Sequence, residues 1–217
     1  MAKYDLVIFD VDGTLLDTTE GVLTAVRYTI DKFGFAPLPE EKLLKFIGPP
    51  IQNSFADAYG LSGDILQEIA TVFRNRYSQH DLFGAVPYDG IFDAMQALKD
   101  NGIMPAVATY KREDYAITLL KHFGFDRYTS IMHGGDHENK LKKADIIQKC
   151  ISESGISDKK RAVMIGDTEN DAVGAEKIGV DFLAVTYGFG FKTPESLNSV
   201  KYTGVSGNVP GLLEFIL

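Results

Sequence analysis

The chain has 217 residues, of which 45% are hydrophobic and 24% charged, and its formal net charge is −8. This composition is typical of a globular protein with a sizeable core, and it excludes disordered, collagen-like and coiled-coil chains. The excess of acids disfavours nucleic-acid polymers and anionic membranes as partners, because both attract clustered cations. No apolar run is long enough to cross a bilayer, and acids interrupt the first segment, so we expect a cytoplasmic protein without a signal peptide.

The predicted elements begin with a buried strand. Residues 4–9 (YDLVIF) form a continuous apolar run, which is typical of a strand covered on both faces in a parallel sheet. Two apolar stripes with helical spacing follow: Val22, Val26, Ile30 and Phe33, then Ile65, Ile69, Val72, Phe73 and Tyr77. Turn-forming segments separate these stripes. We therefore place an inserted helical module at residues 18–84.

The remainder of the chain alternates strands and helices. Further strands are expected at residues 103–108, 161–165 and 181–186, with a weaker candidate at 128–132. Helical spacing appears between them around Ile91, Tyr115, Ile146 and Ala172, and glycines suited to a left-handed cap follow these segments. The alternation predicts an α/β fold, a doubly wound parallel sheet with a Rossmann-like core in residues 1–17 and 85–217.

The single cysteine and the four histidines do not predict a metal or redox site. Cys150 has no partner for an internal disulfide and lies on the apolar face of a predicted helix, which favours a buried small hydrophobe over a nucleophile. His133 and His137 occur around a stretch, GGDHEN, that is typical of a loop. They form no helical pair with an acidic partner, so zinc binding there is disfavoured.

Two aspartates follow the carboxyl end of the first predicted strand. Asp10 and Asp12 follow the apolar run within FDVDGTLLD, at the edge of an open α/β sheet where ligands bind. Alternation along an extended chain places both side chains on one side, where their repulsion needs a cation or a proton. A hard divalent cation would satisfy them. Two solvated acids in a turn at Gly13 are the alternative interpretation.

Matching groups follow the other predicted strands. Asp167 and Asp171 are four residues apart in VMIGDTEND, so both can line the first turn of a helix. Stabilisation of the helix dipole is the alternative explanation for these acids. Thr109 ends the second run and Lys143 directly precedes a helical pattern, so both can project toward the same sheet edge. Taken singly each signal is weak, and a solvated Lys143 is the alternative.

Together these segments resemble the haloacid dehalogenase-like hydrolase superfamily. The shared pattern is D-x-D-G-T at Asp10 to Thr14, a threonine at Thr109, a lysine at Lys143 and G-D-x-x-x-D at Gly166 to Asp171, in the family's order. The helical insert resembles the family's small helical cap. The segments HFGF, KADII and VTYGFG resemble its phosphoglycolate-phosphatase-like branch.

The resemblance implies a phosphatase with Mg²⁺ as its cofactor. Asp10 would be the nucleophile that forms an aspartyl-phosphate, and Asp12 the acid that protonates the leaving alkoxide and then activates water. The metal site would comprise the carboxylates of Asp10 and Asp167 and the backbone carbonyl of Asp12. Asp171 would orient Lys143 or metal-bound water.

The resemblance also implies where the substrate lies. Thr109 and Lys143 would hold the non-bridging phosphoryl oxygens, and further contacts are expected at Gly13, Tyr110, Gly48, Pro49 and Ile51. The carboxylate at Asp12 favours a phosphatase over a dehalogenase, because an alkoxide needs a proton on leaving and a halide does not. Tyr110 stands where related phosphatases usually have a small polar residue, often followed by Lys-Pro, whereas Lys111 and Arg112 follow here. The segment IQNSF also lacks an arginine often found in that loop.

A small phosphorylated metabolite is therefore the expected substrate, with phosphoglycolate, nucleoside monophosphates and sugar phosphates all fitting. A phosphosugar mutase of the β-phosphoglucomutase type shares the catalytic set and is the alternative function. A phospho-accepting signalling domain would need neither the helical insert nor Asp12. No G-x-G-x-x-G follows the first strand, which disfavours a dinucleotide-binding module. We expect a monomer or a weak homodimer.

Overall fold

The computed structural model describes residues 2–138 and 140–217, so Asn139 at the end of the GGDHEN stretch lies outside the described residues. The described chain divides into two compact units. The small unit is Thr18–Val86, and the large unit contains the residues up to Asp17 and those of Pro87–Leu217. The chain therefore leaves the large unit once, after Asp17, and returns to it at Pro87. The two connecting segments, β2 (Leu16–Asp17) and β3 (Val86–Pro87), pair with each other.

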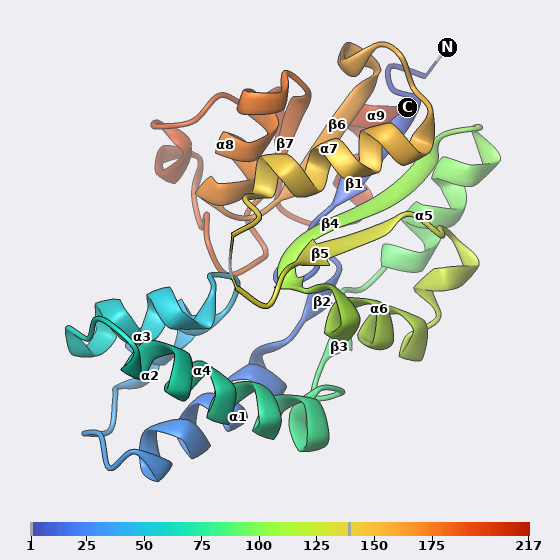
Figure 1. The fold of residues 1–217 in the computed structure, drawn as a ribbon. Helices are drawn as coiled ribbons and strands as arrows, with labels where there is room; N and C mark the ends of the chain where they lie inside the picture. The colour runs from blue at the N-terminus through green and yellow to red at the C-terminus, as the bar shows by residue number, and fades with distance from the viewer. Residues whose placement is uncertain (1, 139) are drawn as a thin grey trace. The chain divides into compact units, whose positions relative to one another are not determined.

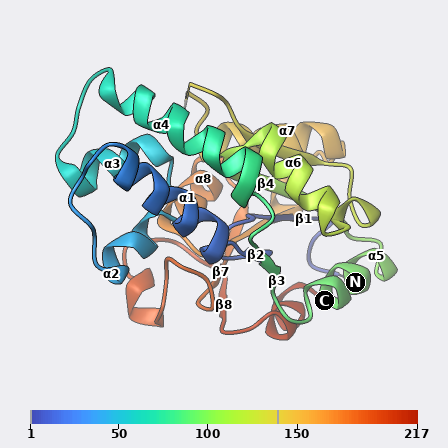
Figure 2. The same ribbon diagram turned by 90° about the horizontal axis from the view of Figure 1, so that it is seen from below.

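Within the described residues, six parallel strands form one sheet in the large unit, in the order β5-β4-β1-β6-β7-β8; Figure 1 labels the first five, and Figure 2 also labels β8. The strands are β1 (Leu6–Phe9), β4 (Met104–Arg112), β5 (Met132–Gly135), β6 (Ala162–Gly166), β7 (Asp181–Val185) and β8 (Gly204–Ser206). Leu6 of β1 lies opposite Met104 of β4 on one side and Ala162 of β6 on the other. All four residues of β1 are buried, as expected for a strand covered on both faces.

Helices cover both faces of this sheet. The helices of the large unit are α5 (Ile91–Asp100), α6 (Glu113–His122), α7 (Lys143–Ser154), α8 (Glu169–Ile178) and the short α9 (Leu213–Ile216). The chain passes from β1 to β4 and β5 through α5 and α6, then returns past β1 to β6 and β7 through α7 and α8. Right-handed crossovers in opposite directions place their helices on opposite faces, and α7 and α8 cover the face toward the viewer in Figure 1. The doubly wound α/β fold predicted from the sequence is confirmed.

The face under α7 and α8 holds one hydrophobic cluster. Leu6 and Ile8 of β1 pack there with Ile147 and Cys150 of α7 and Ala172 of α8. The helical spacing seen in the sequence is thus the buried stripe of each helix. The order of the strands reverses between β1 and β6, and the carboxyl ends of the strands at such a reversal are where an open α/β sheet binds ligands.

Three strands of the sheet differ from the sequence prediction. The strand expected at 103–108 is β4, which continues to Arg112, so Thr109 lies within it. The weak candidate at 128–132 forms a strand only from Met132, and this strand continues to Gly135, so the first two residues of GGDHEN, Gly134 and Gly135, lie in a strand and not in the predicted loop. A Cβ atom at Gly134 would come 2.5 Å from the Cα atom of Glu113, so only glycine fits where β5 passes the start of α6. β8 at the sheet edge was not predicted, because it is only three residues long.

The small unit is helical. Its helices are α1 (Thr19–Lys32), α2 (Glu40–Leu43), the 3-10 turn Leu44–Phe46, α3 (Ile51–Tyr59), α4 (Ile65–Arg76) and a π-helical turn, Tyr77–Asp81. α1 and α3 both pack against α4 (Figure 2). The backbones of Gly21 and Gly84 approach closely: the Gly21 N–H donates to the Gly84 carbonyl at 2.8 Å, and a Cβ atom at Gly21 would lie 2.2 Å from the Asp81 carbonyl oxygen. None of the described helices has the length and apolarity needed to span a membrane.

Candidate active site

The predicted catalytic groups converge at the carboxyl ends of the strands in the large unit. Asp10 directly follows β1 and Asp167 directly follows β6, and these two strands are neighbours. Lys143 is the first residue of α7, and Asp171 lies in the first turn of α8. All four side chains are buried, none being more than 5% exposed. Residues far apart in the sequence therefore form one buried polar cluster.

Asp171 has two sets of contacts. Its Oδ2 atom accepts hydrogen bonds from the Thr168 N–H at 3.1 Å and the Thr168 hydroxyl at 2.7 Å, which completes a capping box at the start of α8. Its Oδ1 atom lies 2.6 Å from Nζ of Lys143. One carboxylate thus stabilises the helix terminus and also holds the lysine.

Lys143 is enclosed by acceptors. Its Nζ atom lies 2.8 Å from Oδ1 of Asp10, and it donates a hydrogen bond to the Ala108 carbonyl at 3.0 Å. Burial alone would lower the pKa of this lysine, but the carboxylates of Asp10 and Asp171 outweigh burial and hold its pKa above the ordinary value. Lys143 is therefore a fully charged ammonium group at neutral pH.

A loop after β7 fixes the carboxylate of Asp167. Its Oδ2 atom accepts hydrogen bonds from the N–H groups of Phe189, at 2.6 Å, and Gly190, at 2.9 Å. A Cβ atom at Gly13 would lie 2.3 Å from this oxygen, and one at Gly188 would lie 2.5 Å from it, so both positions require glycine. These backbone donors were not predicted as part of the site.

Asp12 makes a separate contact. Its Oδ1 atom lies 3.1 Å from Nζ of Lys111, a residue that the sequence analysis did not place in the site. The Asp12 carboxylate is not in the group of acids whose oxygens lie closest together, which consists of Asp10, Asp167 and Asp171. A metal contact through the Asp12 backbone carbonyl stays a prediction.

The cluster fits a divalent cation. One oxygen from each of Asp10, Asp167 and Asp171 lies within 4.8 Å of the others, and Oδ1 of Asp167 is buried without a hydrogen-bond partner among the described residues. Four carboxylates face two lysines, which leaves two negative charges unbalanced when all are ionised. Burial, followed by neighbouring carboxylates, raises the pKa of Asp10 to about 6 and that of Asp167 to about 7. Hard oxygen ligands and excess negative charge suit Mg²⁺ or a similar cation.

Thr109 and Tyr110 lie in β4 beside this cluster. Thr109 is buried, and its hydroxyl oxygen accepts a hydrogen bond from the Lys111 N–H at 3.2 Å. The Tyr110 hydroxyl accepts a hydrogen bond from the Lys143 N–H at 3.0 Å, and the Tyr110 ring lies 5.5 Å from Nζ of the same lysine. Tyr110 therefore helps to fix the start of α7. Its predicted contact with substrate stays a prediction.

Comparison with known proteins identifies the family. A family model described as haloacid dehalogenase-like hydrolase matches residues 7–185, which include every member of the buried cluster. The chain belongs to the haloacid dehalogenase-like hydrolase family. The resemblance derived from the sequence motifs is thereby confirmed.

Several relatives of this hydrolase have names that state an activity. The chain is 31% identical to a 5'-nucleotidase of Pseudomonas aeruginosa, over 87% of this chain and 85% of the relative. It is 32% identical to a phosphoglycolate phosphatase of Agrobacterium fabrum, over 85% and 81% of the two chains. A protein of Mycobacterium tuberculosis named tyrosine-protein kinase PtkA is 33% identical, and the match covers 85% of this chain but 63% of that protein.

A solved structure agrees with these relatives. The crystal structure of a predicted phosphatase from Clostridium acetobutylicum superimposes with a TM-score of 0.90 and 32% identity, covering 97% of each chain. Nearly the whole of this hydrolase, and so most of each of its two units, is matched by nearly the whole of this relative.

The cysteine and the histidines of the hydrolase are outside the catalytic cluster. Cys150 is buried, its thiol donates to the Val107 carbonyl at 3.2 Å, and burial raises its pKa to about 12. It is therefore a poor nucleophile at neutral pH. His133 lies between Glu153, at 2.7 Å, and Glu113, at 3.6 Å. The metal-binding group found among the described residues contains aspartates alone.

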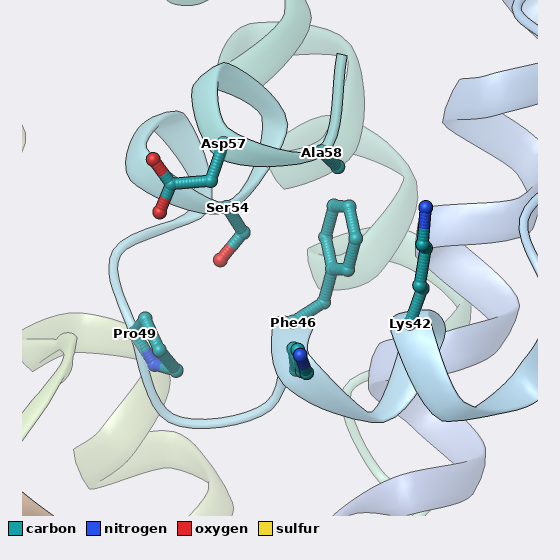
Figure 3. A pocket seen from close by; sticks show the side chains of 7 residues that line it. Lys42, Phe46, Pro49, Ser54, Asp57 and Ala58 are labelled. Atoms are coloured by element: carbon teal, nitrogen blue, oxygen red, sulfur yellow. The ribbon is translucent and has the colours of Figure 1, made fainter. Parts of the chain in front are cut away.

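The small unit contains a pocket of its own, of about 240 Å³ (Figure 3). The lining residues are Lys42, Lys45, Phe46, Pro49, Ser54, Asp57 and Ala58. The buried hydroxyl of Ser54 has no hydrogen-bond partner among the described residues, and Figure 3 shows it pointing into the space between Pro49 and Phe46. Among the residues predicted to contact the substrate, Pro49 lines this pocket. Gly48 adopts a φ of 100°, which favours glycine, and Ile51 is the buried first residue of α3.

Without a divalent cation, the hydrolase should lose stability as the pH rises from about 4 to about 8. In the folded chain the pKa values of Asp10 and Asp167 are about 6 and about 7, above the ordinary aspartate value of 3.8. The folded chain then binds more protons than the unfolded chain in this interval, so the free energy of unfolding falls as the pH rises. Urea unfolding at several pH values in the presence of a chelator measures this slope. Added Mg²⁺ should stabilise the chain more at high pH, because it binds ionised carboxylates.

The control for this pH dependence is Asp167→Asn, which removes one titrating group. The variant should show a shallower fall in the free energy of unfolding between pH 4 and 8. A slope equal to that of the unsubstituted chain would contradict the assignment of the effect to Asp167.

Proposed function

We propose that this protein is a Mg²⁺-dependent phosphomonoester hydrolase that acts on a small phosphorylated metabolite through an aspartyl-phosphate intermediate. The observation that carries the proposal is the buried cluster in which Asp10, at the end of β1, faces Lys143 while a buried oxygen of Asp167 has no hydrogen-bond partner among the described residues. Membership of a hydrolase family supports it. So do the relatives named 5'-nucleotidase and phosphoglycolate phosphatase, which match over most of their length.

The proposed reaction has two displacements at phosphorus. A carboxylate oxygen of Asp10 attacks, and its bond to phosphorus forms as the bond to the leaving oxygen breaks. Asp12 gives its proton to that oxygen, and the product departs as an alcohol. Asp12, now ionised, takes a proton from water, whose oxygen attacks phosphorus and releases inorganic phosphate and Asp10. The two aspartates thus end in the states in which they began.

Positive charge and hydrogen-bond donors are required beside Asp10, because a phosphate dianion repels a carboxylate nucleophile. Lys143 supplies one positive charge at 2.8 Å from Asp10, and Thr109 supplies a hydroxyl group. Bound Mg²⁺, held by the carboxylates of Asp10 and Asp167 and by the backbone carbonyl of Asp12, would supply further positive charge for the phosphoryl oxygens. Asp171 keeps the Lys143 ammonium group in place through their 2.6 Å contact.

The small unit is proposed to select the substrate. Its pocket combines two cations, Lys42 and Lys45, with the apolar side chains of Phe46 and Pro49 and the hydroxyl of Ser54, for which the described residues supply no hydrogen-bond partner. A pocket with a few polar groups among apolar walls is typical of a small-molecule site. The predicted substrate contacts at Gly48, Pro49 and Ile51 are part of this proposal. We separately propose a cytoplasmic location.

The test is phosphate release from a panel of phosphoglycolate, nucleoside monophosphates and sugar phosphates, measured with Mg²⁺ and with a chelator. We expect release from at least one compound, its loss with the chelator and its return on adding Mg²⁺. Isomerised sugar phosphate without free phosphate would establish the mutase alternative, which none of the reported relatives is named for. Phosphate transfer to protein, without release, would favour the activity in the name of the kinase relative. No release from any compound would contradict the proposal.

The same panel tests the small unit. Ser54→Ala removes a buried hydroxyl that has no hydrogen-bond partner in the part of the chain that the structure describes, so it should leave the free energy of unfolding nearly unchanged. Ser54→Ala and Pro49→Ala should each change the ratios of kcat/KM between compounds several-fold, because discrimination between substrates is a ratio of these constants. Ser78→Ala, outside the pocket, is the control. A uniform loss over the whole panel would mean that the pocket does not select the substrate.

A further inference from the structure

A second lysine enters the catalytic cluster from β4. Nζ of Lys111 lies 3.1 Å from Oδ1 of Asp12, and the two side chains are only 7% and 6% exposed. Lys143, by contrast, contacts Asp10 and Asp171. The two lysines therefore contact different carboxylates: Lys143 contacts that of the proposed nucleophile, Asp10, and Lys111 contacts that of the proposed acid and base, Asp12.

The irregular end of β4 brings Lys111 to this place. The register between β4 and β5 shifts between Ala108 and Arg112, and the Lys111 N–H donates to the Thr109 hydroxyl oxygen at 3.2 Å. Such irregularities redirect side chains at the end of a strand. The next residue, Arg112, pairs with the carboxylate of Asp114 instead. Of these two neighbouring cations, Lys111 is the one that meets the catalytic cluster.

We propose that Lys111 is a positioning residue that holds the Asp12 carboxyl group for proton exchange with the leaving oxygen and with water. The inference rests on the proposed function. When Asp12 is ionised, its charge lies close enough to that of Asp10 for the two to repel each other. A cation at hydrogen-bonding distance offsets this repulsion and restricts the orientation of the carboxyl group. Because both side chains are nearly buried, solvent screens the contact only weakly.

This role predicts a dependence on the leaving group. A leaving alkoxide needs the proton of Asp12, whereas p-nitrophenolate is stable enough to leave with little protonation. Loss of a residue that acts through Asp12 should therefore slow alkyl phosphates far more than p-nitrophenyl phosphate. Loss of a residue that simply binds the phosphoryl group or supports the fold should slow both alike.

The experiment compares Lys111→Met with the unsubstituted enzyme on p-nitrophenyl phosphate and on the best alkyl phosphate of the panel. We expect kcat for the alkyl phosphate to fall about tenfold or more beyond the fall for p-nitrophenyl phosphate, with little change in KM. Lys111→Arg, which keeps the charge, should restore part of the loss. Lys121→Met, at an exposed position of α6, is the matched control and should leave both rates unchanged.

A double-mutant cycle with Asp12→Asn decides whether Lys111 acts through Asp12. In the Asp12→Asn enzyme, Lys111→Met should cause no further loss that depends on the leaving group. Equal losses on both substrates, or the full effect of Lys111→Met persisting without the Asp12 carboxylate, would overturn the proposal.

A second readout does not depend on activity. Lys111→Met should shift the midpoint of urea unfolding more in the unsubstituted chain than in Asp12→Asn, because only the former contains the ion pair. Equal shifts would overturn the proposal whatever the kinetics. The two proposals can fail separately. If the unsubstituted chain releases no phosphate, the proposed function is rejected. If the shifts in the unfolding midpoint are nevertheless unequal, the contact between Lys111 and Asp12 is retained.

Discussion

Replacing Asp10 with asparagine should reduce phosphate release about 10⁴-fold or more, to background, because an amide is a poor nucleophile and a neutral metal ligand. The shape of the side chain is kept, and Lys143 retains its 2.6 Å contact with Asp171. The fold should therefore persist. The measurement is steady-state phosphate release with Mg²⁺, alongside circular dichroism and the urea unfolding midpoint of both proteins.

Two comparisons make this result decisive. Asparagine can deamidate to aspartate, which would regenerate a trace of the original enzyme. Asp10→Ala cannot do so, and any turnover by this variant is therefore its own. Asp93→Asn, a substitution on α5 at a position outside the buried cluster, should keep full activity. Metal-dependent release by folded Asp10→Ala at a rate near that of the unsubstituted enzyme would refute Asp10 as the nucleophile.

Lys143→Met should combine a large loss of activity with a loss of stability. The substitution leaves Asp10 and Asp171 buried without their cation, and removing one partner of a buried ion pair typically lowers the free energy of unfolding by about 3–5 kcal/mol. The proposed reaction also loses the positive charge beside the nucleophile, for which we expect a fall in kcat of about 100-fold or more. Urea unfolding and phosphate release measure the two effects separately.

The pH dependence of the Lys143→Met variant provides its internal check. Without the ammonium group, the pKa of Asp10 should rise further above its value of about 6. The loss of stability should then be smaller at pH 5, where the folded chain can take up protons, than at pH 8. Lys121→Met, on the surface of α6, should show neither effect. A loss of stability independent of pH would point to altered packing and not to uncompensated charge.

The sequence predicted the residues that follow the strands because two regular patterns coincide there. Buried parallel strands are continuous apolar runs, and the carboxyl ends of such strands meet at one edge of the sheet. Asp10 and Asp167 could therefore be placed side by side without knowledge of any contact between them. Lys143 and Asp171 followed from the starts of two helices with clear apolar stripes.

Lys111 could not be placed by the same reasoning. A lysine near the end of a strand is most often solvated, and its direction here depends on the irregular register of β4 against β5. Such an irregularity leaves no sequence pattern. The loop that holds Asp167 was missed for a different reason: the donors are the backbone N–H groups of Phe189 and Gly190, which no side-chain motif reveals. The signal that could have found it is a glycine-rich segment directly after the strand at 181–186.

The position of β1 in the sheet has a consequence for how the chain folds as it is synthesised. β1 is made first among the strands, yet it pairs with β4, from Met104, and β6, from Ala162, which are made only after the whole small unit. Pairings this distant in the chain form slowly, because a long loop must close before they can contribute. Until then the apolar residues of β1 remain without their sheet. The strand that directly precedes the proposed nucleophile thus waits for its partners while most of the chain is made, and its unpaired edges are open to misfolding during that time.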